Sequence, residues 1–230
     1  MSGTAVRGIS SMATRALLAD LAAAHSQASG VAVAFESVGG VDAAKRVQAG
    51  EAFDVVVLAA DAIAKLVAGG QLLADSVVPL VLSGVAVAMP AGAPRPDLAS
   101  EASVRQAVLA ATSVGYSTGP SGVQLLALFD RWGIREQLQG RLLQAPPGVP
   151  VAALVARGEV ALGFQQLSEL IHVPGIAIAG PLPPAIQINT TFSGAVGVAA
   201  AQPDAARALL AYMASAQAEP AKRAQGMAPA

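Results

Sequence analysis

Short apolar runs alternate with amphipathic segments along most of this chain, and this alternation restricts its fold more than any other feature. Strands that alternate with helices are typical of a parallel sheet with right-handed crossovers. The first part of the chain predicts such a series, in which Gly30 ends the first helix and Gly50 follows the second. The strands predicted in this series are Arg7–Ile9, Val31–Phe35 and Val55–Leu58.

A second series of the same kind occupies residues 85 to 180, so an α/β fold is predicted for the whole chain. Its predicted strands are Val85–Met89, Val114–Tyr116 and Val160–Phe164. From Ile186 the chain turns apolar and extended again, and a helix is predicted over Ala205–Ala216. A chain that completes a second lobe and then adds a strand and a helix often returns to the first lobe, and two crossings form a hinge.

We therefore predict two α/β lobes with mostly parallel sheets and a hinge. One lobe comprises residues 1–82 and 188–230, and the other comprises residues 85–185. A single doubly wound domain is the alternative.

Composition excludes several classes of partner. Hydrophobic residues make up 54% of the chain and charged residues 13%, and the net charge is −1. With no basic stripe and few aromatic residues, nucleic acid is not an expected partner. The sequence contains no apolar run of about 18 residues or more, the length that a membrane-spanning helix needs, so no membrane insertion is expected. Cysteine is absent, which removes disulfides, thiolate nucleophiles and Cys-ligated metals.

The sequence is compatible with two cellular compartments. Residues 1–4 lead almost directly into the first predicted strand, with no basic n-region and apolar h-region. The protein is periplasmic if an export signal has been removed, and cytoplasmic otherwise.

Two turns from a strand to a helix carry hydroxyl groups. The N-terminus of a helix favours an anion, and glycine lets a ligand approach the backbone closely. The turns predict a small anionic ligand held between the two lobes, although a helix N-cap or a polar turn would use the same residues. The residues concerned are Ser10 and Ser11 in the first turn, and Ser117, Thr118, Gly119, Ser121 and Gly122 in the second, before a helix predicted at Val123–Trp132.

No motif predicts a metal or a cofactor. The histidines, His25 and His172, have no neighbouring second ligand, and His25 is interpreted as a cap at a helix C-terminus. The sequence contains no Gly-x-Ser-x-Gly elbow, Walker loop or Gly-x-Gly-x-x-Gly motif. Asp54 and Asp61 flank a strand and do not form the carboxylate pair of a hydrolase.

Several short segments together resemble the type II periplasmic solute-binding fold, and in particular its molybdate-binding branch. They are Ile9–Ser11, Ala43–Gly50, Val155–Gly163 and Gly226–Pro229, and the resemblance extends from Gly8 to Met227. It implies a ligand in a cleft between two lobes, and the membrane component of an ABC transporter as a partner. The resemblance also implies which residues contact the ligand. In the first half of the chain they are Ser10 or Ser11, together with Ser37, Gly39 and Gly40. In the second half they are residues 117–122 and the segment after Val160–Phe164, which contains Gln166.

The sequence departs from the molybdate-binding branch at two of these places. Gln165 and Gln166 stand where molybdate binders have a tyrosine, and Ser37 is followed by Gly39 and Gly40 where they have a run of serines. Residues 117–122 and 167–175 look more like relatives that handle small organic acids, one of which, aconitate isomerase, is an enzyme. The chain is therefore interpreted as a binding protein or sensor for a small carboxylate or oxyanion.

The alternative is an isomerase that moves a proton along an allylic tricarboxylate such as aconitate. Such chemistry needs a base within hydrogen-bond reach of a carbon-bound proton. The candidates near the predicted cleft are Glu36, Tyr116 and Glu169.

Overall fold

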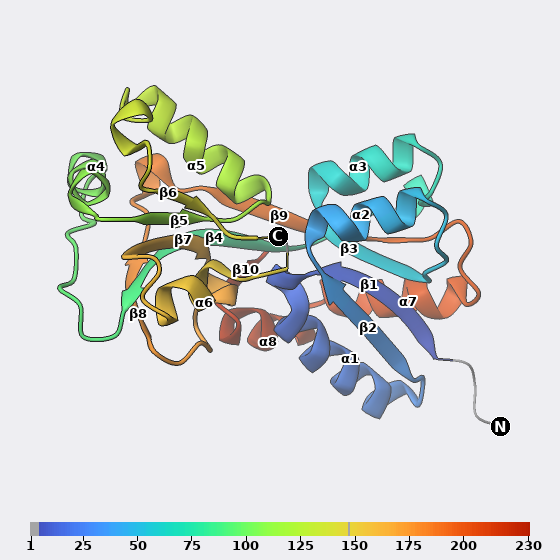
Figure 1. The fold of residues 1–230 in the computed structure, drawn as a ribbon. Helices are drawn as coiled ribbons and strands as arrows, with labels where there is room; N and C mark the ends of the chain where they lie inside the picture. Colours follow the sequence, from blue (N-terminus) through green and yellow to red (C-terminus); the bar gives the residue numbers. More distant parts are fainter. Residues whose placement is uncertain (1–4, 147) are drawn as a thin grey trace. The chain divides into compact units, whose positions relative to one another are not determined.

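Strands and helices alternate as predicted in the computed structural model, which describes residues 5–146 and 148–230, and this confirms the α/β class (Figure 1). The first series comprises β1 (Val6–Ser11), α1 (Arg15–Ser29), β2 (Val33–Val38), α2 (Gly40–Gln48), β3 (Val55–Ala59) and α3 (Ala60–Ala68). The long strand β4 (Val78–Pro90) follows. The second series comprises α4 (Glu101–Ala110), β5 (Val114–Tyr116), α5 (Pro120–Arg131), β6 (Leu142–Gln144), α6 (Val151–Ala156), β7 (Leu162–Gln166) and β8 (Ile176–Pro181). The chain ends with β9 (Asn189–Val196), α7 (Pro203–Ala214), α8 (Glu219–Ala224) and β10 (Met227–Pro229).

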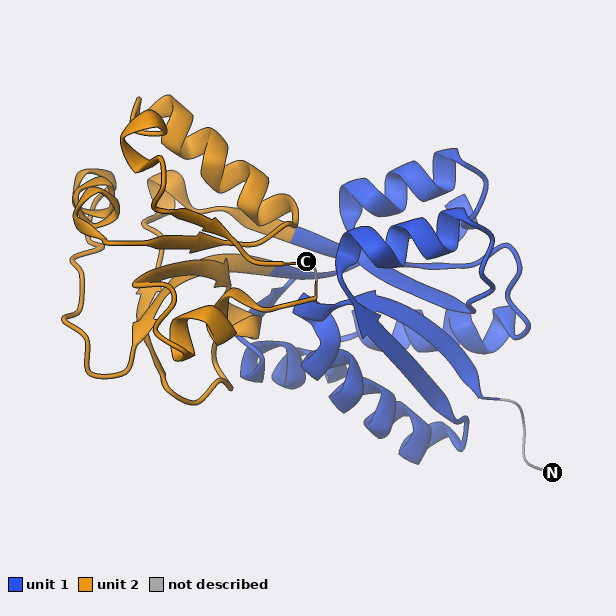
Figure 2. Ribbon diagram, viewed as in Figure 1, with its two compact units in different colours: residues 1–82, 191–230 blue, residues 83–190 orange. Residues whose placement is uncertain are grey.

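The chain divides into two compact units (Figure 2). Unit 1 comprises residues 1–82 and 191–230, and unit 2 comprises residues 83–190. The chain passes from unit 1 to unit 2 within β4 and returns within β9. Among the described residues, no helix is long and apolar enough to span a membrane.

The sheet of unit 1 has the order β2-β1-β3-β9. Strand β1 is parallel to both β2 and β3, and β9 is antiparallel to β3. Figure 1 shows α1 and α7 on one face of this sheet and α2 and α3 on the other. Val55 and Val57 pack on the first side, while Val56 and Leu58 pack on the second. A strand buried on both faces needs apolar side chains at every position, which explains the continuous apolar run of β3.

The sheet of unit 2 has the order β4-β7-β5-β6, and β8 also pairs with β4. Strand β5 is parallel to β6 and β7, whereas β4 is antiparallel to β7. On one face, the ring of Phe129 in α5 meets that of Phe164 in β7 edge to face. On the other face, α6 packs so closely that an alanine Cβ at Gly163 would lie 2.5 Å from Val155. Glycine in β7 therefore fixes the close approach of α6.

Several boundaries differ from the predicted ones, and the differences alter the local setting of candidate residues. Strand β2 continues to Val38 and β7 to Gln166, so Ser37 and Gln166 lie within strands and not after them. Helix α5 begins at Pro120, three residues before the predicted start, because Gly119 is the N-cap and proline suits the first helical position. Ser121 consequently lies in the first turn of a helix.

One predicted strand was too short and other strands were not predicted, because these strands carry polar, glycine or proline residues that interrupt the apolar pattern. Strand β4 begins at Val78 and not at residue 85, since Ser83 and Gly84 break its alternation. The pattern also missed β6 and β8, of which the second contains a glycine and ends in a proline. The predicted extended segment from Ile186 corresponds to β9, which begins at Asn189.

A buried carboxylate ties three segments of unit 1 together. Asp54, only 4% exposed, lies just before β3. Its two oxygens accept hydrogen bonds from the backbone N–H of Arg7 (2.8 Å) and from that of Gln202 (2.9 Å), the N-cap of α7. The carboxylate thus joins the start of β1 to the start of α7, and its negative charge lies at the N-terminus of that helix, where the helix dipole favours it.

Replacing Asp54 with alanine is expected to destabilise the protein by roughly 2–6 kcal/mol, because a backbone donor left without its partner costs about 1–3 kcal/mol and two are left here. Urea unfolding followed by circular dichroism measures the change. Asp75→Ala is the matched control, since its side chain is 72% exposed and its carboxylate pairs with Arg207 on the surface. A loss no larger than that of the control would show that Asp54 does not hold these segments together.

Candidate functional site

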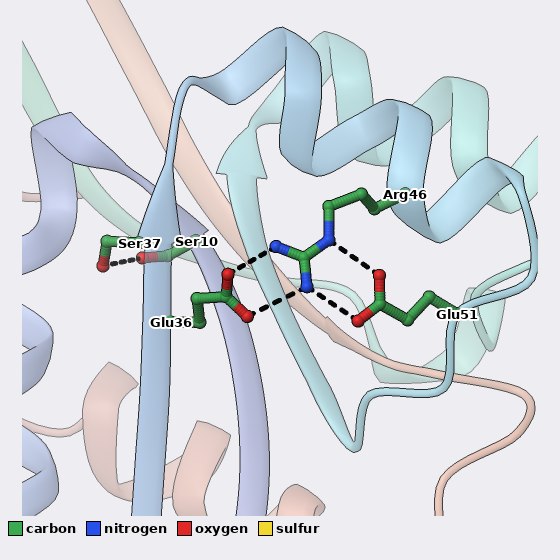
Figure 3. A network of polar contacts seen from close by, with 5 residues as sticks. All are labelled: Ser10, Glu36, Ser37, Arg46 and Glu51. Atoms are coloured by element: carbon green, nitrogen blue, oxygen red, sulfur yellow. Dashed lines mark hydrogen bonds and ion pairs between the residues drawn. The ribbon is translucent and has the colours of Figure 1, made fainter. Parts of the chain in front are cut away.

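In unit 1 the candidate serines lie where parallel strands end. Ser10 and Ser37 are direct neighbours across β1 and β2, and their hydroxyl oxygens are 2.8 Å apart (Figure 3). Ser10 also donates to the carbonyl oxygen of Ser11 at 3.3 Å. Because a hydroxyl carries one hydrogen, that bond leaves Ser37 as the donor to Ser10. The pair is therefore held in place by the protein itself.

Ser11 is different, because its hydroxyl has no hydrogen-bond partner among the described residues although it is buried. Ser11 is the N-cap of the short 3-10 helix Met12–Thr14, but its side chain makes no capping hydrogen bond. Interpreting this side chain as a helix cap is therefore wrong. An alanine Cβ at Gly40 would lie 3.4 Å from the Cβ of Ser11, so the Ser11 side chain lies beside the start of α2.

The N-terminus of α2 has no side-chain cap. Gly39 is the N-cap residue and Gly40 is the first helical residue. The first N–H groups of a helix have no intrahelical partner, and they carry the positive end of the helix dipole. Asp42, also in the first turn, places a negative charge nearby. The groups at this point are therefore backbone hydrogen-bond donors, with no excess of positive side chains.

In unit 2 the hydroxyl groups gather between the end of β5 and the start of α5. The hydroxyl oxygens of Ser117 and Ser121 are 3.2 Å apart, and Ser121 is buried. Thr118 is exposed. The N-cap residue of α5 is Gly119, so no side chain caps this helix. An alanine Cβ at Gly122 would lie 1.9 Å from the carbonyl oxygen of Ser117. Glycine is thus required for the loop to fold back onto the helix.

Two glutamines end β7, and each has a defined partner. The Nε2 of Gln166 donates to the Oγ1 of Thr190 at 2.9 Å, while its Oε1 is buried without a partner among the described residues. The Oε1 of Gln165 accepts from the backbone N–H of Ala152 at 3.0 Å, near the start of α6. Only the carbonyl oxygen can accept that bond, so the amide nitrogen of Gln165 faces Glu169, with Nε2 and Oε1 2.8 Å apart.

Glu169 follows β7 in the 3-10 helix Leu167–Glu169. Burial raises the pKa of its carboxyl to about 7, and the hydrogen bond from Gln165 opposes that shift only in part. A carboxyl group that titrates near neutral pH can both take up and release a proton. Of the three candidate bases, Glu169 has the environment that proton transfer needs.

The other two candidate bases are in less suitable surroundings. Arg46 binds both oxygens of Glu36, at 2.5 and 2.9 Å, and also binds Glu51 at 2.7 Å (Figure 3). The hydrogen bonds from Arg46 lower the pKa of Glu36, which is the wrong direction for a base at neutral pH. Tyr116 packs against the hydrophobic core of unit 2.

Sequence reasoning missed one residue and misassigned another. Ser83 in β4 is fully buried, and its hydroxyl has no partner among the described residues; a single serine within an apolar run was the available signal. His25 is not a helix cap, since it is buried with its ring 5.2 Å from that of Tyr212. Across residues 5–146 and 148–230, no group of three or more His, Cys, Asp or Glu side chains could hold a metal ion.

Comparison with known proteins agrees with the resemblance noted in the sequence. Residues 6–228 match the family described as bacterial extracellular solute-binding protein. The chain belongs to this family. Aconitate isomerase from a Pseudomonas species is 40% identical to it over 232 residues, covering 98% of this chain and 88% of the relative.

Two solved structures share the fold at low sequence identity. The periplasmic molybdate-binding protein of Azotobacter vinelandii has a TM-score of 0.81 at 19% identity, covering 96% of this chain and 98% of that one. The sulfate-binding protein SubI of Mycobacterium tuberculosis has a TM-score of 0.79 at 17% identity, covering 99% and 87%. The prediction of a type II periplasmic solute-binding fold is therefore confirmed.

Replacing Gly122 or Gly119 at the start of α5 with alanine is expected to change the stability of the protein by very different amounts. Gly122→Ala forces the Ser117 carbonyl away and should cost about 1–3 kcal/mol, as overpacking usually does. Gly119→Ala is the control, because its Cβ would meet nothing closer than the Ser117 hydroxyl at 3.8 Å, and a poorer N-cap costs less than about 1 kcal/mol. Thermal unfolding of both variants tests this, and equal midpoints would contradict the packing described for the turn.

Proposed function

We propose that this protein binds a small organic anion, a di- or tricarboxylate, mainly through hydroxyl and backbone N–H groups. The observation that carries the proposal is the buried, unpartnered hydroxyl of Ser11 beside the uncapped N-terminus of α2. Buried polar groups in folded proteins are nearly always hydrogen-bonded, so an unpaired donor at such a place indicates a ligand. Membership of a solute-binding family supports the same function.

The class of ligand follows from the groups available in each unit. None of the candidate residues at the strand ends is Lys or Arg, and hydroxyl and N–H donors suit the oxygens of carboxylates. Gln166 stands where molybdate binders have a tyrosine, which argues against a specialised site for a tetrahedral oxyanion. The relative with 40% identity is named for a tricarboxylate substrate. These points favour organic carboxylates over inorganic oxyanions.

Transport supplies one setting for such binding, since solute-binding proteins of this family commonly deliver ligands to an ABC transporter. The membrane component of such a transporter is the partner that we propose. A periplasmic location follows if the ligand is imported, and a cytoplasmic sensor remains the alternative.

The first test is a thermal-shift screen of di- and tricarboxylates, with sulfate and molybdate for comparison. A ligand at 100 times its Kd should stabilise the protein by about 2.7 kcal/mol. Calorimetric titration of Ser11→Ala with the best ligand should then show a loss of about 1.5–3 kcal/mol, the usual value of a hydrogen bond to a charged group. Ser29→Ala is the control, because its hydroxyl already donates to the carbonyl of His25 at the end of α1.

An unchanged Kd for Ser11→Ala would remove the observation on which the proposal rests. Titration of Ser121→Ala extends the test to unit 2. A loss of affinity in this variant would show that the Ser121 hydroxyl also contacts the ligand.

A second candidate function, isomerisation of a tricarboxylate, is favoured by the pKa of Glu169 together with the aconitate isomerase relative. In this reaction the Glu169 carboxylate takes a proton from a carbon next to the double bond. The electrons of the broken C–H bond form a new double bond, and the former double bond is reprotonated at its far carbon by the carboxylic acid just formed. Atoms and charge balance without a cofactor.

Incubation with cis- or trans-aconitate, followed by chromatography, separates a binder from an isomerase. We expect turnover to rise with pH through about 7 as Glu169 ionises, and to be lost in Glu169→Gln. Glu136→Gln, an exposed carboxyl in the same unit, is the control. Binding without interconversion at any pH would leave the first function alone.

The same carboxyl also predicts a stability effect that does not depend on turnover. The folded protein keeps the Glu169 proton up to pH about 7, whereas the ordinary pKa is 4.5. The folded state therefore binds more protons than the unfolded state between these values, and wild-type stability falls as the pH rises through this window. Glu169→Gln should lack this fall, which urea unfolding at a series of pH values measures.

A further inference from the structure

Three buried polar side chains of unit 2 lie on neighbouring strands. Ser83 is in β4, Gln166 ends β7, and Thr190 is in β9. All three are buried, with Gln166 only 4% exposed. Burying a polar group without a partner costs free energy, so each of these groups needs one.

The strand register places Ser83 and Gln166 on the same face of the sheet. Val85 lies directly opposite Gln166 in the antiparallel pair of β4 and β7. Residues opposite one another project to the same side, and so do residues two apart on one strand. Ser83 is two residues from Val85 and therefore lies diagonally across from Gln166. At such a separation, one small group can contact both side chains.

The hydrogen bonds of these side chains leave two atoms unused. Thr190 accepts from the Nε2 of Gln166 at 2.9 Å, which directs the Oε1 of the amide elsewhere. Both this Oε1 and the Ser83 Oγ are buried without a partner among the described residues. An amide oxygen only accepts hydrogen bonds, whereas a hydroxyl can donate as well as accept. With the amide of Gln166 in this orientation, a group that satisfies both atoms itself carries an O–H or N–H.

We propose that Ser83 and Gln166 form a subsite for an O–H group of the ligand. This group donates to the Oε1 of Gln166 and accepts from the Ser83 hydroxyl. The ligand is then an organic acid with a hydroxyl or an un-ionised carboxyl group, because fully ionised sulfate or molybdate has no donor to offer. This inference rests on the proposed function and narrows its ligand class.

The test uses pairs of acids that differ only in one hydroxyl group, namely citrate with tricarballylate and malate with succinate. Calorimetric titration near neutral pH gives the affinity ratio within each pair for wild type, Ser83→Ala and Gln166→Met. We expect the wild type to prefer the hydroxy acid by about tenfold, and the preference to approach unity in both variants. Ser113→Ala is the control, since that serine of unit 2 accepts from the backbone N–H of Ala161 and should keep the full preference.

An un-ionised carboxyl group as the donor gives a different result. Each pair then shows no preference near neutral pH, but tricarballylate binds about tenfold more tightly to the wild type when the pH is lowered to about 5, where carboxyl groups begin to take up protons. Glu169 titrates over the same range, three residues after Gln166. A gain at low pH therefore supports the subsite only if Gln166→Met abolishes it.

Two outcomes overturn the inference. Equal affinities within each pair, with no gain at low pH, mean that the subsite does not bind an O–H group. A preference that persists unchanged in both Ser83→Ala and Gln166→Met means that it arises elsewhere. If no carboxylate binds the wild type at all, the proposed function fails and the subsite fails with it, so the two failures are distinguishable.

Discussion

Helices cover both faces of the sheet in unit 1, and this arrangement determines where its polar groups can lie. Every residue of β3 is buried, so a polar side chain in the middle of that strand would have no access to water or a ligand. Polar side chains occur instead at the strand ends, with Asp54 just before β3 and Ser10 and Ser11 at the end of β1. In parallel α/β sheets, the carboxyl ends of strands are also where helices begin and where ligands bind.

The two ends differ in how their polar groups are satisfied. Both oxygens of Asp54 accept backbone hydrogen bonds, so its charge serves the fold. At the opposite end, the Ser11 hydroxyl and the N-terminus of α2 are both without a capping bond. This end of the sheet lacks the stabilisation that such hydrogen bonds would supply, as is usual where a protein keeps polar groups available for a ligand. The contrast within one sheet separates a structural polar site from the one that we propose binds the ligand.

Recognition by neutral donors suits the charges that surround these strand ends. Asp42 lies in the first turn of α2, and Arg46 is already engaged by Glu36 and Glu51. A binding site made of neutral donors gains its affinity mainly from the number and direction of its hydrogen bonds. Long-range electrostatic attraction contributes less. The Ser10–Ser37 pair shows how such direction is fixed, since each hydroxyl holds the other before any ligand is present.

Apolar periodicity predicted the order of strands and helices, and it placed β5 correctly at Val114–Tyr116. It failed where polar residues continue a strand, as Ser37 does in β2 and Gln166 in β7, because a pattern of apolar residues cannot extend through them. The serine-bearing turns were predicted from residue types and the positions of helix starts. Ser83 was not: a lone serine in an apolar run drew no attention by itself, and the missing hydrogen-bond partner that makes it notable is seen only in the three-dimensional structure.

In our proposal, the difference between a binder and an isomerase on this scaffold depends on the surroundings of one carboxyl group. Glu169 would be an ordinary anion on the surface, where its pKa would lie well below neutral. Partial burial after β7, with a single hydrogen bond from Gln165, makes the neutral acid accessible at physiological pH. Gln165 is itself fixed by the backbone of α6, so the orientation of its amide is set by the fold. The same packing that positions α6 therefore gives a solute-binding fold a group able to exchange protons near neutral pH.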